Sequence, residues 1–119
     1  MTVNEINNIN LEELISMGSF ACECGKVHSP GVSKVIVEKG AVNSLPALLE
    51  EIGAKKPFLL SGHDTFEAAG ASVTAVLEQN EIDYAKYVFP VSPVRPTEYT
   101  VGSAFMHFDY SCDAIIGIG

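Results

Sequence analysis

The sequence has no long hydrophobic run and little positive charge, and these two deficits exclude broad classes of function. The longest apolar stretches, such as residues 58–60 and 115–118, are far shorter than the roughly 20 residues that a helix needs to cross a bilayer. The first residues also lack the basic segment that begins a secretory signal peptide. We therefore expect no membrane insertion and a cytoplasmic protein.

Basic residues are the second deficit. Seven Lys and Arg residues stand against fifteen Asp and Glu residues, which gives a formal net charge of -8 and a pI near 4.6. Such a chain repels phosphate backbones, so nucleic acids are not expected as partners. The length of 119 residues and the hydrophobic share of 47% are typical of one ordinary globular domain.

Cysteines are few and odd in number, and only Cys22 and Cys24 lie close together in the sequence, with His28 nearby. A chain of this size needs no disulfide, so we expect reduced thiols. Cys22, Cys24 and His28 offer the soft ligands of a zinc loop, but structural zinc sites commonly have four ligands at wider spacing. Two thiolates one residue apart on an extended ribbon also point to opposite faces. The sequence therefore favours reduced cysteines that bind no metal, and a zinc loop is the less favoured alternative.

Recognised catalytic motifs are missing as well. The sequence contains no Gly-x-Ser-x-Gly turn, Walker A segment or His-Glu-x-x-His pair. Cys112 has no assignable histidine or helix N-terminus beside it to lower the pKa of its thiol, which makes it a weak nucleophile. We therefore name no catalytic residue.

Short β-branched runs alternate with segments of helical period from residue 34 onward. The pattern predicts strands at residues 34–38, 57–60, 84–89 and 113–118, with helices near residues 44–52, 64–77 and 97–108. The strands are continuously apolar, which is typical of a parallel sheet covered by helices on both faces. We predict an α/β, Rossmann-like domain over residues 20–119, after an N-terminal helical segment over residues 1–19.

The last predicted strand is as apolar as an interior strand and contains Gly117 just before the final Gly119. In doubly wound sheets, ligands bind beyond the carboxyl ends of the strands, and a glycine-rich turn before a helix holds a pyrophosphate. Such a turn would begin at Gly117 or Gly119. We therefore expect a fragment of a longer enzyme, truncated at the end of a strand; the alternative is a complete chain that ends on this strand.

Three segments of the predicted domain carry a resemblance to a known family. They are Glu-Lys-Gly-Ala at residues 38–41, Ser-Gly-His-Asp-Thr-Phe-Glu-Ala-Ala-Gly at residues 61–70, and Asp-Ala-Ile-Ile-Gly-Ile-Gly at residues 113–119. With the ribbon at residues 20–28, they resemble the N-terminal nucleotide-binding domain of sn-glycerol-1-phosphate dehydrogenases. That family is part of a superfamily with iron-containing alcohol dehydrogenases, glycerol dehydrogenases and dehydroquinate synthases.

The resemblance implies the cofactor-binding part of an NAD(P)-dependent, metal-assisted dehydrogenase that reduces dihydroxyacetone phosphate. It implies as partners a nicotinamide dinucleotide, a small polyol or ketose phosphate, and further copies of the chain in a homo-oligomer. It places the catalytic divalent metal (zinc, nickel or iron) in a C-terminal domain outside this chain, which alone is expected to be inactive. The alternatives are a glycerol dehydrogenase or other iron-type alcohol dehydrogenase, and a stand-alone, non-enzymatic α/β binding domain with a zinc loop.

The resemblance also implies cofactor contacts at two strand ends. They are Gly62, His63, Asp64, Thr65, Gly117 and Gly119. The family's acidic position falls on Gly62, which has no side chain to repel a 2′-phosphate, so we expect use of NADP or of both cofactors. Asp64 is interpreted as a helix N-cap that could also contact the cofactor, and His63 as a solvated neighbour.

Overall fold

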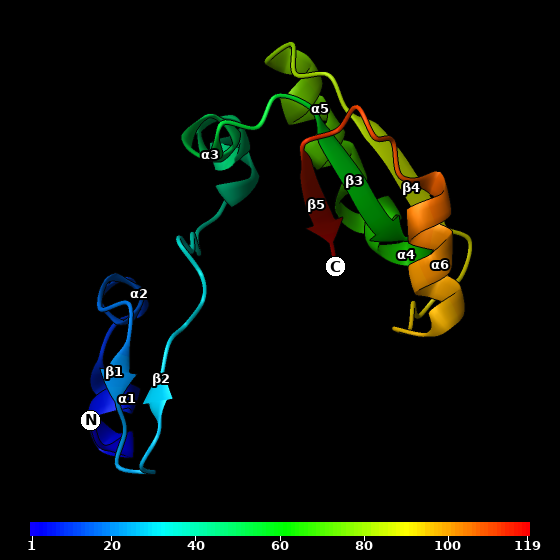
Figure 1. Cartoon of the computed structure of the whole chain (residues 1–119). Coiled ribbons are helices and arrows are strands. Elements are labelled where there is room, and N and C mark those ends of the chain that lie inside the picture. The colour runs from blue at the N-terminus through cyan, green and yellow to red at the C-terminus, as the bar shows by residue number, and fades with distance from the viewer. The chain divides into compact units, whose positions relative to one another are not determined.

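A computed structural model describes all residues of the chain, which divide into two compact units, Met1–Lys39 and Gly40–Gly119 (Figure 1). We call them the N-terminal unit and the α/β unit and describe each by itself. The ribbon around the two neighbouring cysteines belongs to the N-terminal unit. None of the helices is both long enough and apolar enough to span a lipid bilayer.

The N-terminal unit consists of two short helices and a small hairpin. They are α1 (Val3–Asn8), α2 (Leu11–Ser16), β1 (Phe20–Ala21) and β2 (Val27–His28), and the two strands are antiparallel. Side chains cap both helices: Thr2 forms a capping box with Glu5, and Asn10 accepts a hydrogen bond from the backbone N–H of Glu13.

Polar contacts join the start of the chain to the hairpin. The terminal ammonium of Met1 donates to the carbonyl of Ala21 at 2.6 Å, and the backbone N–H of Val3 donates to Glu23 Oε1 at 3.1 Å. No residue of Met1–Lys39 is buried. The N-terminal unit therefore has caps and a hairpin but no hydrophobic core of its own.

The predicted first strand, residues 34–38, is wrong. The three central residues, 35–37, are β-branched, but the segment pairs with no neighbouring strand, and Val37 is 84% exposed. A strand exists only where a partner takes up its backbone N–H and C=O groups, so β propensity alone does not create one. The parallel sheet consequently has three strands instead of the four that the sequence predicts.

The α/β unit is built on that sheet, whose strands are β3 (Pro57–Gly62), β4 (Ala85–Phe89) and β5 (Ala114–Ile118). All three strands are parallel and lie in the order β4-β3-β5. Phe58 pairs with Ala85 on one side and with Ile115 on the other. All three strands were predicted from their apolar runs, and this part of the prediction is confirmed.

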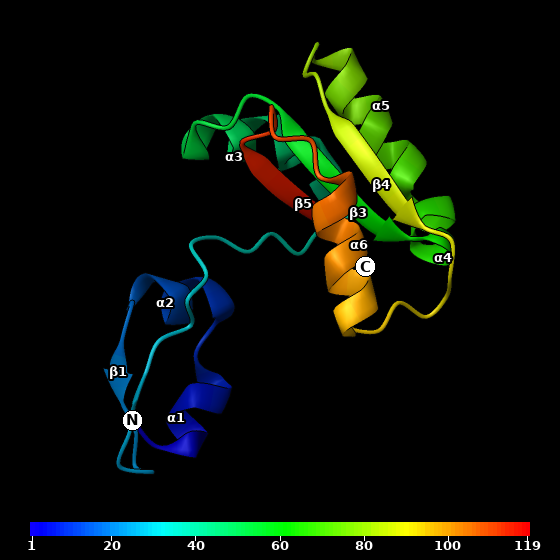
Figure 2. The same cartoon turned by 45° about the vertical axis from the view of Figure 1, so that its right-hand side comes forward.

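Helices cover the two faces of the sheet. The helical elements are η1 (Ala41–Ser44), α3 (Leu45–Ile52), α4 (His63–Thr65), the π-helical turn η2 (Phe66–Gly70), α5 (Ala71–Gln79) and α6 (Glu98–His107). Leu49 of α3 and Leu77 of α5 pack with Leu59 in the buried core. Helix α6 lies on the opposite face of the sheet from α5 (Figure 2). On that face, Phe58 meets the ring of Phe108, just after α6, with ring centroids 5.0 Å apart. The α/β, Rossmann-like fold is thus confirmed.

Candidate functional site

Strand β3 is the point at which the order of the sheet reverses. The chain passes from β3 through α5 to β4 on one side, and then through α6 to β5 on the other side of β3. In open parallel sheets, the crevice beyond the carboxyl ends of two strands that flank such a reversal is the usual ligand site. Here the crevice lies between the end of β3, at Gly62, and the end of β5, next to Gly119.

A shallow hollow of about 420 Å³ opens at this place, which we call the strand-end site. Its lining includes Gly62, Gly117 and Gly119, three of the residues that the sequence predicts as cofactor contacts. A Cβ atom at Gly117 or Gly119 would have no neighbour within 4 Å, whereas one at Gly62 would lie 3.0 Å from Val94 Cγ2. The loop after β4 therefore packs against Gly62, while the other two glycines leave open space.

A buried hydroxyl group joins the two strand ends. Ser61, 4% exposed, places its Oγ 3.1 Å from the carbonyl oxygen of Ile118 and 2.8 Å from Thr65 Oγ1. Thr65 Oγ1 in turn donates to the carbonyl of Gly62 at 3.2 Å. The sequence predicted Thr65 as a site residue but not Ser61, although a lone polar residue at the end of an apolar strand was an available signal.

The N-cap of the helix after β3 lies two residues earlier than predicted. Gly62 is the N-cap of α4 and makes no side-chain cap, so Asp64 lies inside the first turn, and the N-cap interpretation of Asp64 is wrong. A hydrogen bond from Ser92 and another from His63, whose Nδ1 lies 3.3 Å from Asp64 Oδ1, lower the pKa of the Asp64 carboxyl group. The carboxylate therefore stays charged and exposed beside the strand-end site.

His63 lies between two carboxylates. Its Nε2 is 3.7 Å from Glu67 Oε1, and the ligand atoms of His63, Asp64 and Glu67 lie within 4.8 Å of one another. All three side chains are exposed, which is common for acidic groups that hold no metal. The arrangement gives the rim of the site a negative charge but no buried acid or base.

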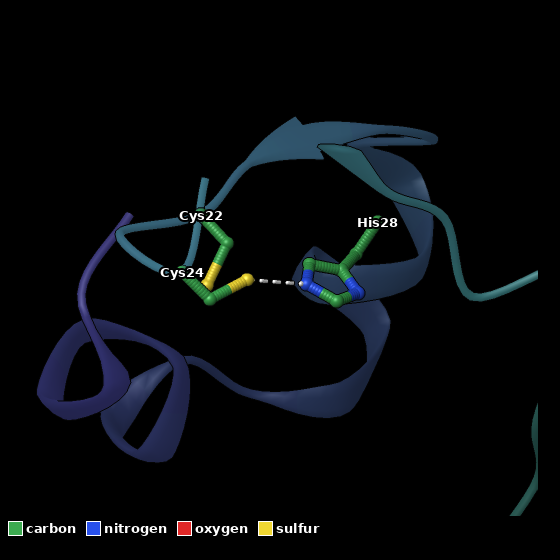
Figure 3. Close-up of side chains that lie close together, drawn as sticks. All are labelled: Cys22, Cys24 and His28. Carbon is green, nitrogen blue, oxygen red and sulfur yellow. Dashed lines mark hydrogen bonds between the residues drawn. The ribbon is translucent and has the colours of Figure 1, made fainter. Parts of the chain in front are cut away.

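Cys22, Cys24 and His28 form a second cluster, in the N-terminal unit (Figure 3). Cys24 Sγ lies 3.1 Å from His28 Nε2, and the three ligand atoms lie within 4.8 Å of one another. The expectation that the two thiols point to opposite faces is wrong, because both cysteines lie in the turn after β1 and not in the strand. There Gly25, with φ of +82°, closes a turn by donating to the carbonyl of Cys22.

The strand-end site presents backbone at three glycines and the hydroxyl of Ser61, and the exposed carboxylate of Asp64 lies beside it. Cys112 lies elsewhere, and burial raises the pKa of its thiol, which disfavours the thiolate that a nucleophile needs.

In comparisons with known proteins, no family model, curated protein or solved structure matches this chain significantly.

Proposed function

We propose that this chain is the dinucleotide-binding part of an NAD(P)-dependent, metal-assisted dehydrogenase similar to sn-glycerol-1-phosphate dehydrogenases. One observation carries the proposal: three glycines line a hollow at the carboxyl ends of β3 and β5, where the strand order reverses. This is the place at which doubly wound sheets bind dinucleotides. Oxidation or reduction of a small polyol or ketose phosphate is the chemistry that the sequence resemblance adds.

The residues at the strand-end site fit a dinucleotide. Gly117 and Gly119 leave open space where a side chain would stand, so a pyrophosphate or ribose can approach the backbone closely. The lining is mainly apolar, which suits the face of a ribose or an adenine ring. The nicotinamide ring supplies hydride chemistry when the cofactor is bound, and the residues of this chain bind and orient the cofactor.

The strand-end site favours NADP, or both cofactors, over strict use of NAD. Enzymes that select NAD commonly place a carboxylate at a strand end, where it accepts the ribose hydroxyls and repels a 2′-phosphate. By the sequence resemblance, this acidic position falls on Gly62, at the end of β3. Gly62 offers no such group. The nearby Asp64 carboxylate is charged and accepts hydrogen bonds from Ser92 and His63, but it is exposed, so solvent screening leaves only a weak repulsion of a 2′-phosphate. In this proposal the substrate is dihydroxyacetone phosphate, the metal (zinc, nickel or iron) is held by residues outside this chain, and a glycerol dehydrogenase remains the nearest alternative.

Titration of the chain with NADPH and with NADH, followed residue by residue in amide NMR spectra, tests the proposal. We expect shifts confined to the strand-end site, from Ser61 to Thr65 and at Gly117 and Gly119. The variant Gly117→Leu places a side chain at the hollow, where its Cβ atom has no neighbour within 4 Å, and should weaken binding by roughly tenfold or more.

Gly102→Leu is the matched control. Gly102 lies in α6, is exposed and has open space around its Cα, but it does not line the hollow. This variant should bind like the unmodified chain. The proposal is rejected if neither nucleotide shifts these resonances, or if the two leucine variants weaken binding equally.

A further inference from the structure

We infer that Cys22, Cys24 and His28 bind one zinc ion, which holds the N-terminal unit together. The inference concerns a different part of the chain from the strand-end site and does not rest on the proposed dehydrogenase function. Three observations carry it: the convergence of the three donor atoms, the hairpin that fixes them, and the lack of a core in the unit that contains them.

The donor atoms are already close to the spacing of a zinc coordination sphere. Bonds of about 2.3 Å to sulfur and about 2.0 Å to nitrogen, arranged tetrahedrally, put the donor atoms about 3.5 to 3.8 Å apart. Cys24 Sγ and His28 Nε2 are 3.1 Å apart, and no two of the three donors are more than 4.8 Å apart. Figure 3 shows the sulfur atom of Cys24 facing the ring nitrogen of His28. Small side-chain rotations would therefore complete three corners of a tetrahedron.

The hairpin backbone sets this convergence. The N–H of Cys22 donates to the carbonyl of Lys26 at 2.9 Å, and the N–H of Gly25 donates to the carbonyl of Cys22 at 3.0 Å. These bonds fold the chain so tightly that both cysteines face back toward β2. His28 is fixed there because it pairs with Phe20, and the two rings lie 5.9 Å apart. The site is thus preorganised by backbone hydrogen bonds.

The N-terminal unit also lacks the usual source of stability. None of its residues is buried, and units of fewer than about 40 residues usually need a disulfide, a metal or a partner to remain folded. Its two cysteines are free thiols. Two thiolates and an imidazole select a soft or borderline cation such as zinc over magnesium or calcium. Cys24 and His28 are exposed, so a water molecule would fill the fourth position.

Metal analysis of the full chain, purified with reductant, loaded with zinc and freed of excess metal, tests the inference. We expect about one zinc ion per chain. Cys24→Ser and His28→Gln should each lower the zinc content at least several-fold. Cys112→Ser is the matched control, because this third cysteine lies in the α/β unit, and it should keep the zinc content of the unmodified chain.

Cobalt substitution in the unmodified chain supplies a measurement that needs no variant. Tetrahedral cobalt with thiolate ligands should give intense visible bands and a sulfur-to-metal charge-transfer band, both removed by added zinc. The inference is overturned if the loaded chain holds no zinc and shows no such bands. It is equally overturned if Cys112→Ser loses as much zinc as Cys24→Ser. Neither result bears on nucleotide binding at the strand-end site, so the two proposals fail separately.

Discussion

At the scale of single residues, the strand-end site depends on a hydroxyl and a glycine that follow one another. Ser61 fills the space between β3 and β5 with a hydrogen-bonding group, while Gly62 leaves space that Val94 approaches. The open space of the site lies at Gly117 and Gly119. The neighbouring Asp64 adds one negative charge at the rim of the site.

Ser61→Ala should lower the free energy of unfolding by about 1 kcal/mol. The substitution removes the hydroxyl that lies between the carbonyl of Ile118 and Thr65, and it leaves buried polar groups without that partner. Urea denaturation measures the change. Ser72→Ala, at an exposed position of α5, is the control and should leave stability the same or slightly higher. Equal stability of both variants would show that the Ser61 hydroxyl does not join the strands.

Asp64→Asn should shift cofactor preference toward NADPH. The exposed carboxylate repels a 2′-phosphate on the bound ribose, and removing its charge relieves that repulsion by an amount that solvent screening limits to a few-fold in affinity. Parallel titrations with NADPH and NADH measure the ratio. Glu13→Gln removes one negative charge from the N-terminal unit and controls for net charge. If the ratio of the affinities for NADPH and NADH is unchanged in Asp64→Asn, the 2′-phosphate of the bound ribose lies away from Asp64.

At the scale of secondary-structure elements, the sequence predicted those helices and strands that a local pattern of residues determines. Helix α3 ends at Gly53, which has the positive φ that the pattern requires, and β3, β4 and β5 follow their apolar runs. The strand predicted at residues 34–38 is absent because strand pairing is a property of two segments, whereas β propensity is a property of one. The convergence of Cys22 and Cys24 was missed for a related reason: it depends on a turn that spacing alone does not reveal.

The turn η2 leads to a prediction about two glycines. Gly70 lies beneath the ring of Phe66, so a Cβ atom there would collide with that ring, whereas Gly102 in α6 faces open space. Gly70→Ala should therefore destabilise the chain by about 1 to 3 kcal/mol. Gly102→Ala should stabilise it by about 0.5 to 1 kcal/mol, because alanine loses less conformational freedom in a helix. Thermal unfolding of both variants gives the sign of each stability change. Stability changes of the same sign would contradict this packing.

At the scale of the whole molecule, the face of the α/β unit that carries α6 exposes several large apolar side chains. They are Phe105, Met106, Tyr110 and Ile115, each more than half exposed. A groove of about 170 Å³ beside them has an entirely apolar lining. Clusters of this kind are typical of surfaces that another protein or domain covers. The homo-oligomer stays a prediction, and sedimentation equilibrium at several concentrations measures it.

Acid should destabilise the α/β unit through two carboxylates at the amino ends of β3 and β5. Hydrogen bonds from Ser111, and then from Lys56, lower the pKa of Asp109 to about 2, and the backbone N–H groups of Lys56 and Lys55 lower the pKa of Asp113. Groups with a lowered pKa stabilise the folded state above their ordinary value, near 3.8, and lose this effect as the pH falls through the folded-state value. The melting temperature should therefore fall between about pH 4 and pH 2.

The double variant Asp109→Asn/Asp113→Asn isolates this effect. Its melting temperature should be lower at neutral pH and should depend less on pH between about pH 4 and pH 2, because the two titrating groups are gone. Calorimetry at several pH values makes the comparison. An acid dependence as steep as that of the unmodified chain would assign acid sensitivity to other carboxylates.

The division into a unit with a core and a unit without one predicts that the two lose structure separately. Removal of zinc by a chelator at neutral pH should expose the amides of residues 1–39 to hydrogen exchange, because the metal would be the main restraint on that unit. Amides of residues 40–119 should keep their protection, since the core around Leu49, Leu59 and Leu77 holds no ligand of that metal. Mild acid should act like the chelator, because protons compete with zinc for thiolate and imidazole ligands. Exchange measured by mass spectrometry separates the two segments, and equal loss of protection in both would mean that the chain unfolds as one unit.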